Sequence, residues 1–235
     1  MKENIISSYC LNGSSVFIEG SNGFAFQVSN TLNEIKVLNN GNDNDISSID
    51  MKECENILKD FYGIDKNISL IILKFIQQDG NNGGKTLKYE VYHPYENYKL
   101  NLSLCENTTV DVYVPLELNE ETEKILNDLI DQGYDPFDLN DKFYREICTP
   151  YTSENGTDVL LDDREEFIYN SLVNATLCPD GCDYTEYSLD KKYIKCECNT
   201  DNTDIVNLDL ENLSGENAYK SFLSTMKASN LIMEV

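Results

Sequence analysis

The chain has 235 residues, of which 42 are acidic and 18 basic, and its formal net charge is −24. Nucleic acids bind proteins largely through Lys and Arg side chains that neutralise phosphates, so this charge excludes DNA and RNA as expected partners. A hydrophobic content of 40% is sufficient for a packed core. No run of about eighteen apolar residues predicts a membrane span, and the N-terminal MKENIISSYC lacks the apolar core of a signal peptide.

The first third of the chain predicts a hairpin and a helix. Residues 15–29 alternate between apolar and polar types around an Asn-Gly pair, which is a strong hairpin signal. Residues 39–48 follow as a loop that we expect to be too polar for burial. Asp50 is then expected to cap a helix over residues 51–62, with Glu53 completing a capping box and Gly63 ending the helix.

The middle of the chain predicts strands and then helices. Four β-branched and aromatic runs separated by turn residues favour an antiparallel sheet, and these runs are residues 68–78, 85–95, 98–105 and 108–118. Residues 119–133 change to a helical period, with Asn119 as the expected N-cap. A second short helix is expected within 135–148, and Asp162 or Asp163 is expected to cap a third over 164–172.

We therefore predict an α+β fold with an antiparallel β-sheet core, short flanking helices and a small disulfide-stapled C-terminal hairpin. The expected divisions are a main domain over 1–170, a cysteine-rich EGF-like hairpin over 171–200, and a polar linker with a C-terminal helix or strand over 201–235. The boundary falls where periodic structure gives way to closely spaced cysteines.

Eight cysteines, an even number, permit complete pairing, although the sequence alone leaves many connectivities open. They are Cys10, Cys54, Cys105, Cys148, Cys178, Cys182, Cys196 and Cys198. Among the last four, Cys196 and Cys198 form a C-x-C pair, and on a strand such a pair sends its two sulfurs to opposite faces. Zinc ribbons instead favour C-x2-C at both ends. We expect Cys178–Cys196 and Cys182–Cys198 disulfides, with Cys10–Cys54 and Cys105–Cys148 as the remaining pairs; a four-thiolate zinc site is the alternative.

The N-x-Ser/Thr pattern of N-glycosylation acceptors gives a second indication of the compartment. Seven asparagines fit this pattern: Asn12, Asn67, Asn101, Asn107, Asn155, Asn174 and Asn212. A chain rich in Asn, Ser and Thr produces several such motifs by chance, so they support secretion modestly.

Other motifs give weaker chemical signals. Residues 79–90 match part of a twelve-residue calcium loop, but both flanks predict strands rather than helices, so we interpret them as a hairpin turn. The single histidine, His93, lacks a second nearby ligand and is expected to be structural. We expect no cofactor, with calcium as an alternative, and find no nucleotide-binding or hydrolase motif.

Four segments carry a resemblance to a known class of protein: SSIDMKECENILKDFYGI, YEVYHPYENYKLNLSLC, NDKFYREICTPYTSENGTDVLLDDREEFIYNS and LCPDGCDYTEYSLDKKYIKCECN. Together they resemble a cysteine-rich extracellular module of large ciliate-type protist surface proteins, which carries an EGF-like disulfide tail. The ordered run from DKFYREICTPY to CECN is the most specific part of this resemblance.

The resemblance implies an ectodomain unit, so membrane attachment would come only through segments outside this chain. We expect a non-enzymatic extracellular or cell-surface module for adhesion, receptor-like binding or cell-coat structure, with an unidentified protein or glycan ligand. The alternatives are a zinc-stabilised interaction protein that uses the C-terminal cysteines, and a calcium-binding acidic module or acidic hydrolase.

Overall fold

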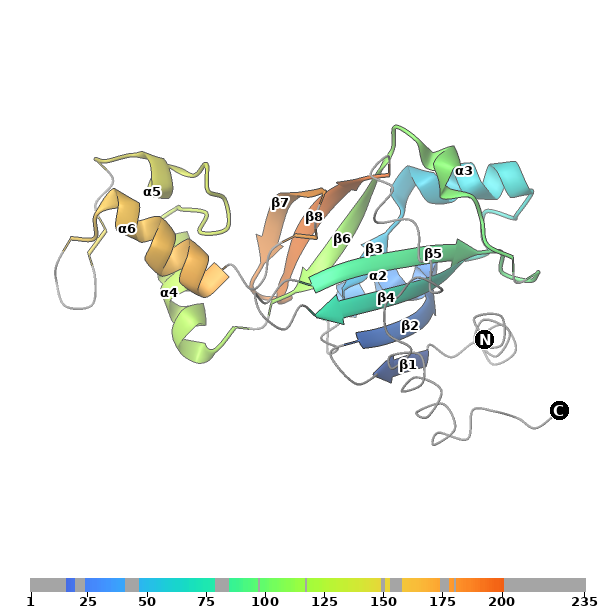
Figure 1. The fold of residues 1–235 in the computed structure, drawn as a ribbon, viewed down its shortest axis with the longest axis horizontal. Coiled ribbons are helices and arrows are strands. Elements are labelled where there is room, and N and C mark those ends of the chain that lie inside the picture. Colours follow the sequence, from blue (N-terminus) through green and yellow to red (C-terminus); the bar gives the residue numbers. More distant parts are fainter. Residues whose placement is uncertain are drawn as a thin grey trace.

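A computed structural model describes residues 16–19, 24–40, 47–78, 85–96, 98–116, 118–148, 151–152, 158–173, 178–179 and 181–200. The predicted linker and helix or strand over 201–235 lie outside these residues. Within them, two four-stranded antiparallel sheets and several short helices form the α+β fold that the sequence predicts (Figure 1).

The first sheet has the strand order β1-β2-β4-β5. Its strands are β1 (Val16–Glu19), β2 (Phe24–Asn30), β4 (Ile71–Gln78) and β5 (Lys85–Tyr92). The predicted pairing of two strands is confirmed, because β1 pairs antiparallel with β2; the Asn-Gly pair itself lies outside the described residues. Residues 85–90 of the calcium-loop match belong to β5 and pair with β4, while residues 79–84 lie outside the described part.

The second sheet has the strand order β3-β6-β8-β7. Its strands are β3 (Ser48–Asp50), β6 (Thr109–Pro115), β7 (Cys182–Ser188) and β8 (Tyr193–Asn199). Strand β8 pairs along its length with β6, so backbone hydrogen bonds join the predicted cysteine-rich hairpin to the sheet of the main domain. The domain division near residue 170 stays a prediction.

One hydrophobic core joins the two sheets and α3 (Lys52–Tyr62). Ile72 and Val91 of the first sheet, Val112 and Cys196 of the second, and Leu58 of α3 are all at most 1% exposed. Tyr89 is also buried, and this burial raises the pKa of its phenol. The alternation of apolar residues along β6 and β8 therefore directs one face of the second sheet into this core.

The predictions for residues 31–52 need correction. Helix α2 (Thr31–Asn40) was not predicted, and Ser47 and Ser48, placed in a polar loop, are buried. Asp50 accepts a hydrogen bond from Lys52 N, but Met51 is the N-cap of α3 and makes no side-chain cap bond. The expected end of this helix is confirmed, because Gly63 has φ 68° and a side chain in that left-handed conformation would be strained.

The predicted strand over 98–105 is wrong, since Leu102–Cys105 form the short helical turn η2 with Asn101 as its cap. Helix α4 (Glu120–Asp131) begins as expected after Asn119, whose side chain accepts from Thr122 N at 2.8 Å. The short α5 (Lys142–Arg145) is capped by Asp141.

Helix α6 (Leu161–Arg164) continues into the wider helix η3 (Glu165–Val173). Its N-cap is Leu160, so Asp162 and Asp163 lie in the first turn rather than at the cap. Figure 1 shows α4, α5 and α6 grouped beside the second sheet, at the end that carries the β7–β8 turn. None of the helices in the described ranges is long and apolar enough to cross a membrane.

Candidate functional site: an aromatic cleft beside the disulfide hairpin

Two disulfides fix the β7–β8 hairpin, and both match the predicted pairing. Cys178 bonds to Cys196 and Cys182 to Cys198, each with an S–S distance of 2.02 Å. The first bond attaches the segment before the hairpin to β8, and the second crosslinks the two strands. These four sulfurs are therefore joined in pairs and do not form the four-thiolate set that the zinc alternative requires.

The predicted pairs involving the other four cysteines are wrong. Cys54 bonds to Cys105, not to Cys10, and connects α3 to η2 across 51 residues of sequence. Both cysteines are fully buried, because η2 packs against α3 and brings them together. Cys148 is a free, exposed thiol, and Cys10 lies outside the described residues. The sequence alone could not show that residues 102–105 turn toward α3.

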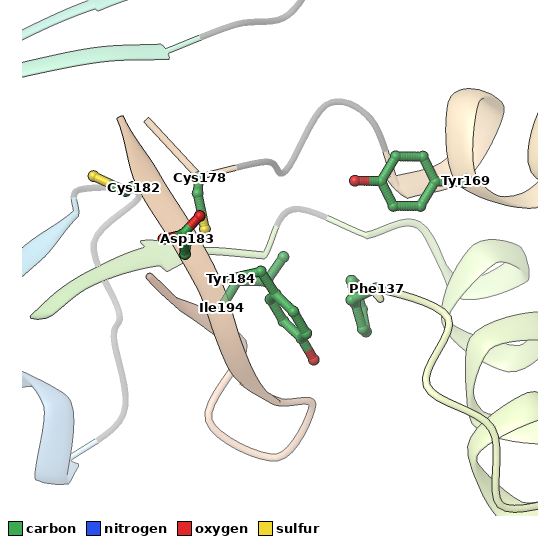
Figure 2. A pocket seen from close by; sticks show the side chains of 7 residues that line it. All are labelled: Phe137, Tyr169, Cys178, Cys182, Asp183, Tyr184 and Ile194. Carbon is green, nitrogen blue, oxygen red and sulfur yellow. The ribbon is translucent and has the colours of Figure 1, made fainter. Parts of the chain in front are cut away.

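An open cleft of about 220 Å³ lies between the hairpin and the helical segments. Its lining residues are Phe137, Tyr169, Cys178, Cys182, Asp183, Tyr184 and Ile194. In Figure 2 the rings of Tyr184 and Phe137 lie next to each other, and Tyr169 extends from η3 toward the hairpin. The cleft is smaller than the roughly 300–1,000 Å³ of typical small-molecule sites, so its size suits one side chain rather than a cofactor.

The acidic loop that forms one wall begins after α4. Asp135, Asp138 and Asp141 each accept a hydrogen bond from the backbone N–H two residues further on, at 2.8–2.9 Å. These local bonds explain why an acidic, Asn-containing stretch folds into a compact series of turns. They also fix Asp135 and Asp138, whose negative charges act on Tyr184 of the cleft.

A hydrogen bond connects this loop to the hairpin. The Tyr184 hydroxyl donates to Asp135 Oδ2 at 2.7 Å. Burial raises the pKa of Asp135, although the bonds from Tyr184 and the Phe137 N–H oppose that shift. Burial first, and then the bond to Asp135 and its negative charge, raise the pKa of Tyr184 well above its usual value. The phenol therefore stays protonated and continues to donate at neutral pH.

Aromatic rings near the cleft already bind cations of the chain itself. The Lys142 ammonium lies 4.9 Å from the centroid of the Tyr134 ring. Arg164 is 4% exposed, and its guanidinium lies 5.3 Å from the centroid of the Phe143 ring and donates to Phe143 O at 3.0 Å. Tyr134 packs on Phe143, and Phe137 packs on Tyr184 and Tyr187. Rings and carboxylates together form a surface that is chemically suited to a positive group.

The sequence singled out the cysteines of this region but not its aromatic residues. Phe137 follows the Asp-Pro turn, and Tyr184 and Tyr187 share the inward face of β7 because the register shifts between Tyr184 and Glu186. Strand alternation alone predicts Tyr184 on the same face as Cys182 and Tyr187 on the opposite face. The register shift between Tyr184 and Glu186 brings Tyr187 onto the face of Tyr184. The sequence also gives no signal that residues 135–141 lie against this hairpin.

His93 has a structural position. It is 9% exposed, and its Nδ1 accepts from Tyr95 N at 3.3 Å and from Glu96 N at 3.2 Å. Nδ1 therefore carries no proton in this arrangement, and the ring closes the turn after β5. Among the described residues, no group of three or more His, Cys, Asp or Glu side chains is placed to hold a metal ion.

Three of the seven glycosylation motifs are in the described residues. Asn67, Asn101 and Asn107 are all exposed, as an acceptor asparagine must be. Asn67 follows α3, and the other two flank η2. The other four motifs, at Asn12, Asn155, Asn174 and Asn212, lie outside the residues that the structure describes.

No protein-family model matches the chain, and no curated protein or solved structure matches it significantly.

Proposed function

We propose that the chain is a non-enzymatic extracellular or cell-surface module that binds a protein partner through the aromatic cleft. Three disulfides and three exposed glycosylation motifs support an oxidising, secretory location. The resemblance to ciliate-type surface proteins with an EGF-like tail supports the same class. Adhesion, receptor-like binding and cell-coat assembly all fit such a module.

The observation that carries the binding proposal is the cleft itself. Its rings come from a disulfide-fixed hairpin, an acidic loop and η3, and Asp183 lies in its wall. A rigid, side-chain-sized hollow with aromatic faces and nearby carboxylates suits a Lys or Arg side chain, because such a cation gains from both the ring quadrupole and the negative charge. The bound group would be a basic side chain on the surface of the partner.

The test uses the disulfide-intact chain and a set of immobilised eight-residue peptides that differ only in a central Arg, Lys, norleucine or Glu. We expect the Arg and Lys peptides to retain the protein several-fold better than the norleucine and Glu peptides, and retention to weaken as salt is added. Tyr169→Ala should lower retention toward the norleucine level. Tyr95→Ala replaces another tyrosine, 69% exposed and outside the cleft lining, and serves as the matched control.

Equal retention of all four peptides, or equal losses in Tyr169→Ala and Tyr95→Ala, would overturn the cleft as the binding site. The location is tested separately by alkylating the secreted protein without reductant. If Cys54, Cys105, Cys178, Cys182, Cys196 and Cys198 were all alkylated, the extracellular assignment would fail.

A further inference from the structure

Five aromatic rings pack in successive pairs near the C-terminal end of α3, and three of them are exposed. Phe61 and Tyr62 end that helix, and His93, Tyr95 and Tyr98 come from the segment after β5. Ring centroids are 4.9 Å apart for Phe61–Tyr62, 5.8 Å for Tyr62–Tyr98, 5.0 Å for Tyr98–His93 and 6.2 Å for His93–Tyr95. We call these five residues the aromatic row.

Three of the five rings are exposed, whereas Tyr62 is half-buried and His93 is buried. Phe61 is 65% exposed, Tyr95 69% and Tyr98 37%. Single exposed rings are ordinary, but contiguous apolar surface in a soluble protein marks a place that something else covers. The Cys54–Cys105 disulfide connects α3, which carries Phe61 and Tyr62, to η2, which Asn101 caps.

Asn101 lies directly against this row. Its backbone N–H donates to the Tyr62 hydroxyl at 3.1 Å, so its side chain starts within one residue's length of that ring. Asn101 is exposed and begins the acceptor motif Asn-Leu-Ser. An N-linked glycan attached here would leave the surface beside Tyr62 and Tyr98.

The side chain of Asn101 is also held in a form that suits modification. Its Oδ1 accepts from Ser103 N at 3.1 Å and caps η2. N-glycosylation changes only Nδ2, so the modified amide retains its carbonyl and this cap. At Asn67, by contrast, Nδ2 donates to Asp65 Oδ1 at 3.0 Å, and Asn107 lies at the far end of η2 with φ 67°.

We propose that Asn101 carries an N-linked glycan whose first sugars pack on the aromatic row. The covalent step joins Asn101 Nδ2 to C1 of the sugar of a lipid-linked diphosphate oligosaccharide; Nδ2 loses a proton and the lipid diphosphate leaves. The C–H faces of pyranose rings then cover the aromatic faces through dispersion and weak C–H···π contacts. This inference rests on the extracellular location proposed above, and it does not involve the cleft.

The test expresses the chain in a eukaryotic secretory system and maps glycopeptides by mass spectrometry. Ser103→Ala removes the motif but keeps Asn101 and the residue-103 N–H that it caps, while Ser103→Thr keeps the motif. We expect a glycan on Asn101 in the wild type and in Ser103→Thr, and none in Ser103→Ala.

Packing is tested by thermal unfolding with the same variants. Ser103→Ala should lower the melting temperature by about 2–4 °C relative to Ser103→Thr, the shift that about 1 kcal/mol gives for a chain of this size. In a Phe61→Ala background, which removes a ring that is 65% exposed, this difference should disappear.

An unmodified Asn101 in protein that carries a glycan on Asn67 would overturn the inference and leave the extracellular location intact. Reduced cysteines together with no glycan on any motif would overturn both. A modified Asn101 with identical melting temperatures in Ser103→Ala and Ser103→Thr would refute the packing.

Discussion

Glu34 and Lys74 form an ion pair that is almost fully buried, at 2% and 1% exposure. Lys74 Nζ donates to Glu34 Oε2 at 2.7 Å and to Ser47 O at 2.6 Å. Ile49 N donates to the same carboxylate at 3.0 Å. This pair therefore joins α2, β3 and β4, and each charge depends on the other because neither reaches water.

Replacing Glu34 with Gln preserves the size of the side chain but leaves the Lys74 ammonium buried without an opposite charge. We expect the free energy of unfolding at pH 7 to fall by about 3–5 kcal/mol, measured by urea unfolding. Glu53→Gln, at an exposed site on α3, should change it by less than about 0.5 kcal/mol. Equal effects of the two substitutions would contradict the role of the pair.

The loss in Glu34→Gln should also depend on pH. Burial lowers the pKa of Lys74 below its usual 10.5, and the charge of Glu34 opposes that shift, so the substitution lowers the pKa further. At pH values between the folded-state pKa of Lys74 and 10.5, the unfolded chain binds more protons than the folded chain. The free energy of unfolding therefore rises with pH in this range. The deficit of the variant should therefore shrink as the pH is raised toward 10.

Local side-chain chemistry explains which elements could be predicted from the sequence. The β1–β2 hairpin and the start of α4 depend on signals within a few residues, namely Asn-Gly and the Asn119 cap. Helix α2 was missed because it follows β2 without a break, although Asn30 Oδ1 accepts from Asn33 N and gives a local start signal. The turn η2 requires the distant Cys54, and no local pattern indicates that partner.

At the scale of elements, the outward face of the second sheet carries a row of carboxylates. Asp50 lies opposite Asp111, Asp111 opposite Glu197, and Glu197 opposite Asp183, so one acid from each strand stands in register. Like charges directly opposite destabilise a sheet. Lys52 Nζ lies 2.5 Å from Asp111 and 3.0 Å from Glu197, and Lys195 lies 3.3 Å from Asp111.

Lys52→Met should therefore destabilise the fold at neutral pH and much less in acid. The hydrogen bond that Glu197 accepts from Lys52 is the largest of the influences that lower the pKa of Glu197. A lowered carboxylate pKa contributes stability above the unfolded pKa, and this contribution is lost as pH falls through the folded pKa. The difference in melting temperature between wild type and Lys52→Met should thus be largest near pH 7 and narrow as the pH falls below about 4.

The matched control for Lys52→Met is Lys66→Met, because Lys66 is 72% exposed and lies 3.8 Å from Asp60, which is 66% exposed. Such a surface pair contributes little, so its removal should leave the melting temperature almost unchanged at either pH. If the difference in melting temperature between wild type and Lys52→Met stays constant from pH 7 to pH 3, the carboxylate row does not need this lysine.

At the scale of the whole molecule, the disulfides act against a strongly unbalanced charge. A net charge of −24 disfavours compact states through self-repulsion, so covalent links that restrict the unfolded chain matter more here than in a neutral protein. Cys54–Cys105 closes the longest loop among the three described disulfides, with a separation of 51 residues against 18 and 16. Loop-closure entropy alone makes it worth about 4 kcal/mol.

Replacing Cys54 and Cys105 together with Ala should lower the free energy of unfolding by about 4 kcal/mol, measured by urea unfolding under non-reducing conditions. Replacing the free, exposed Cys148 with Ser should leave it unchanged and serves as the control. Because self-repulsion is screened by salt, the double variant should recover part of its stability at about 0.5 M NaCl. Equal stability of the double variant and Cys148→Ser would mean that packing of η2 against α3, rather than the crosslink, connects these two elements.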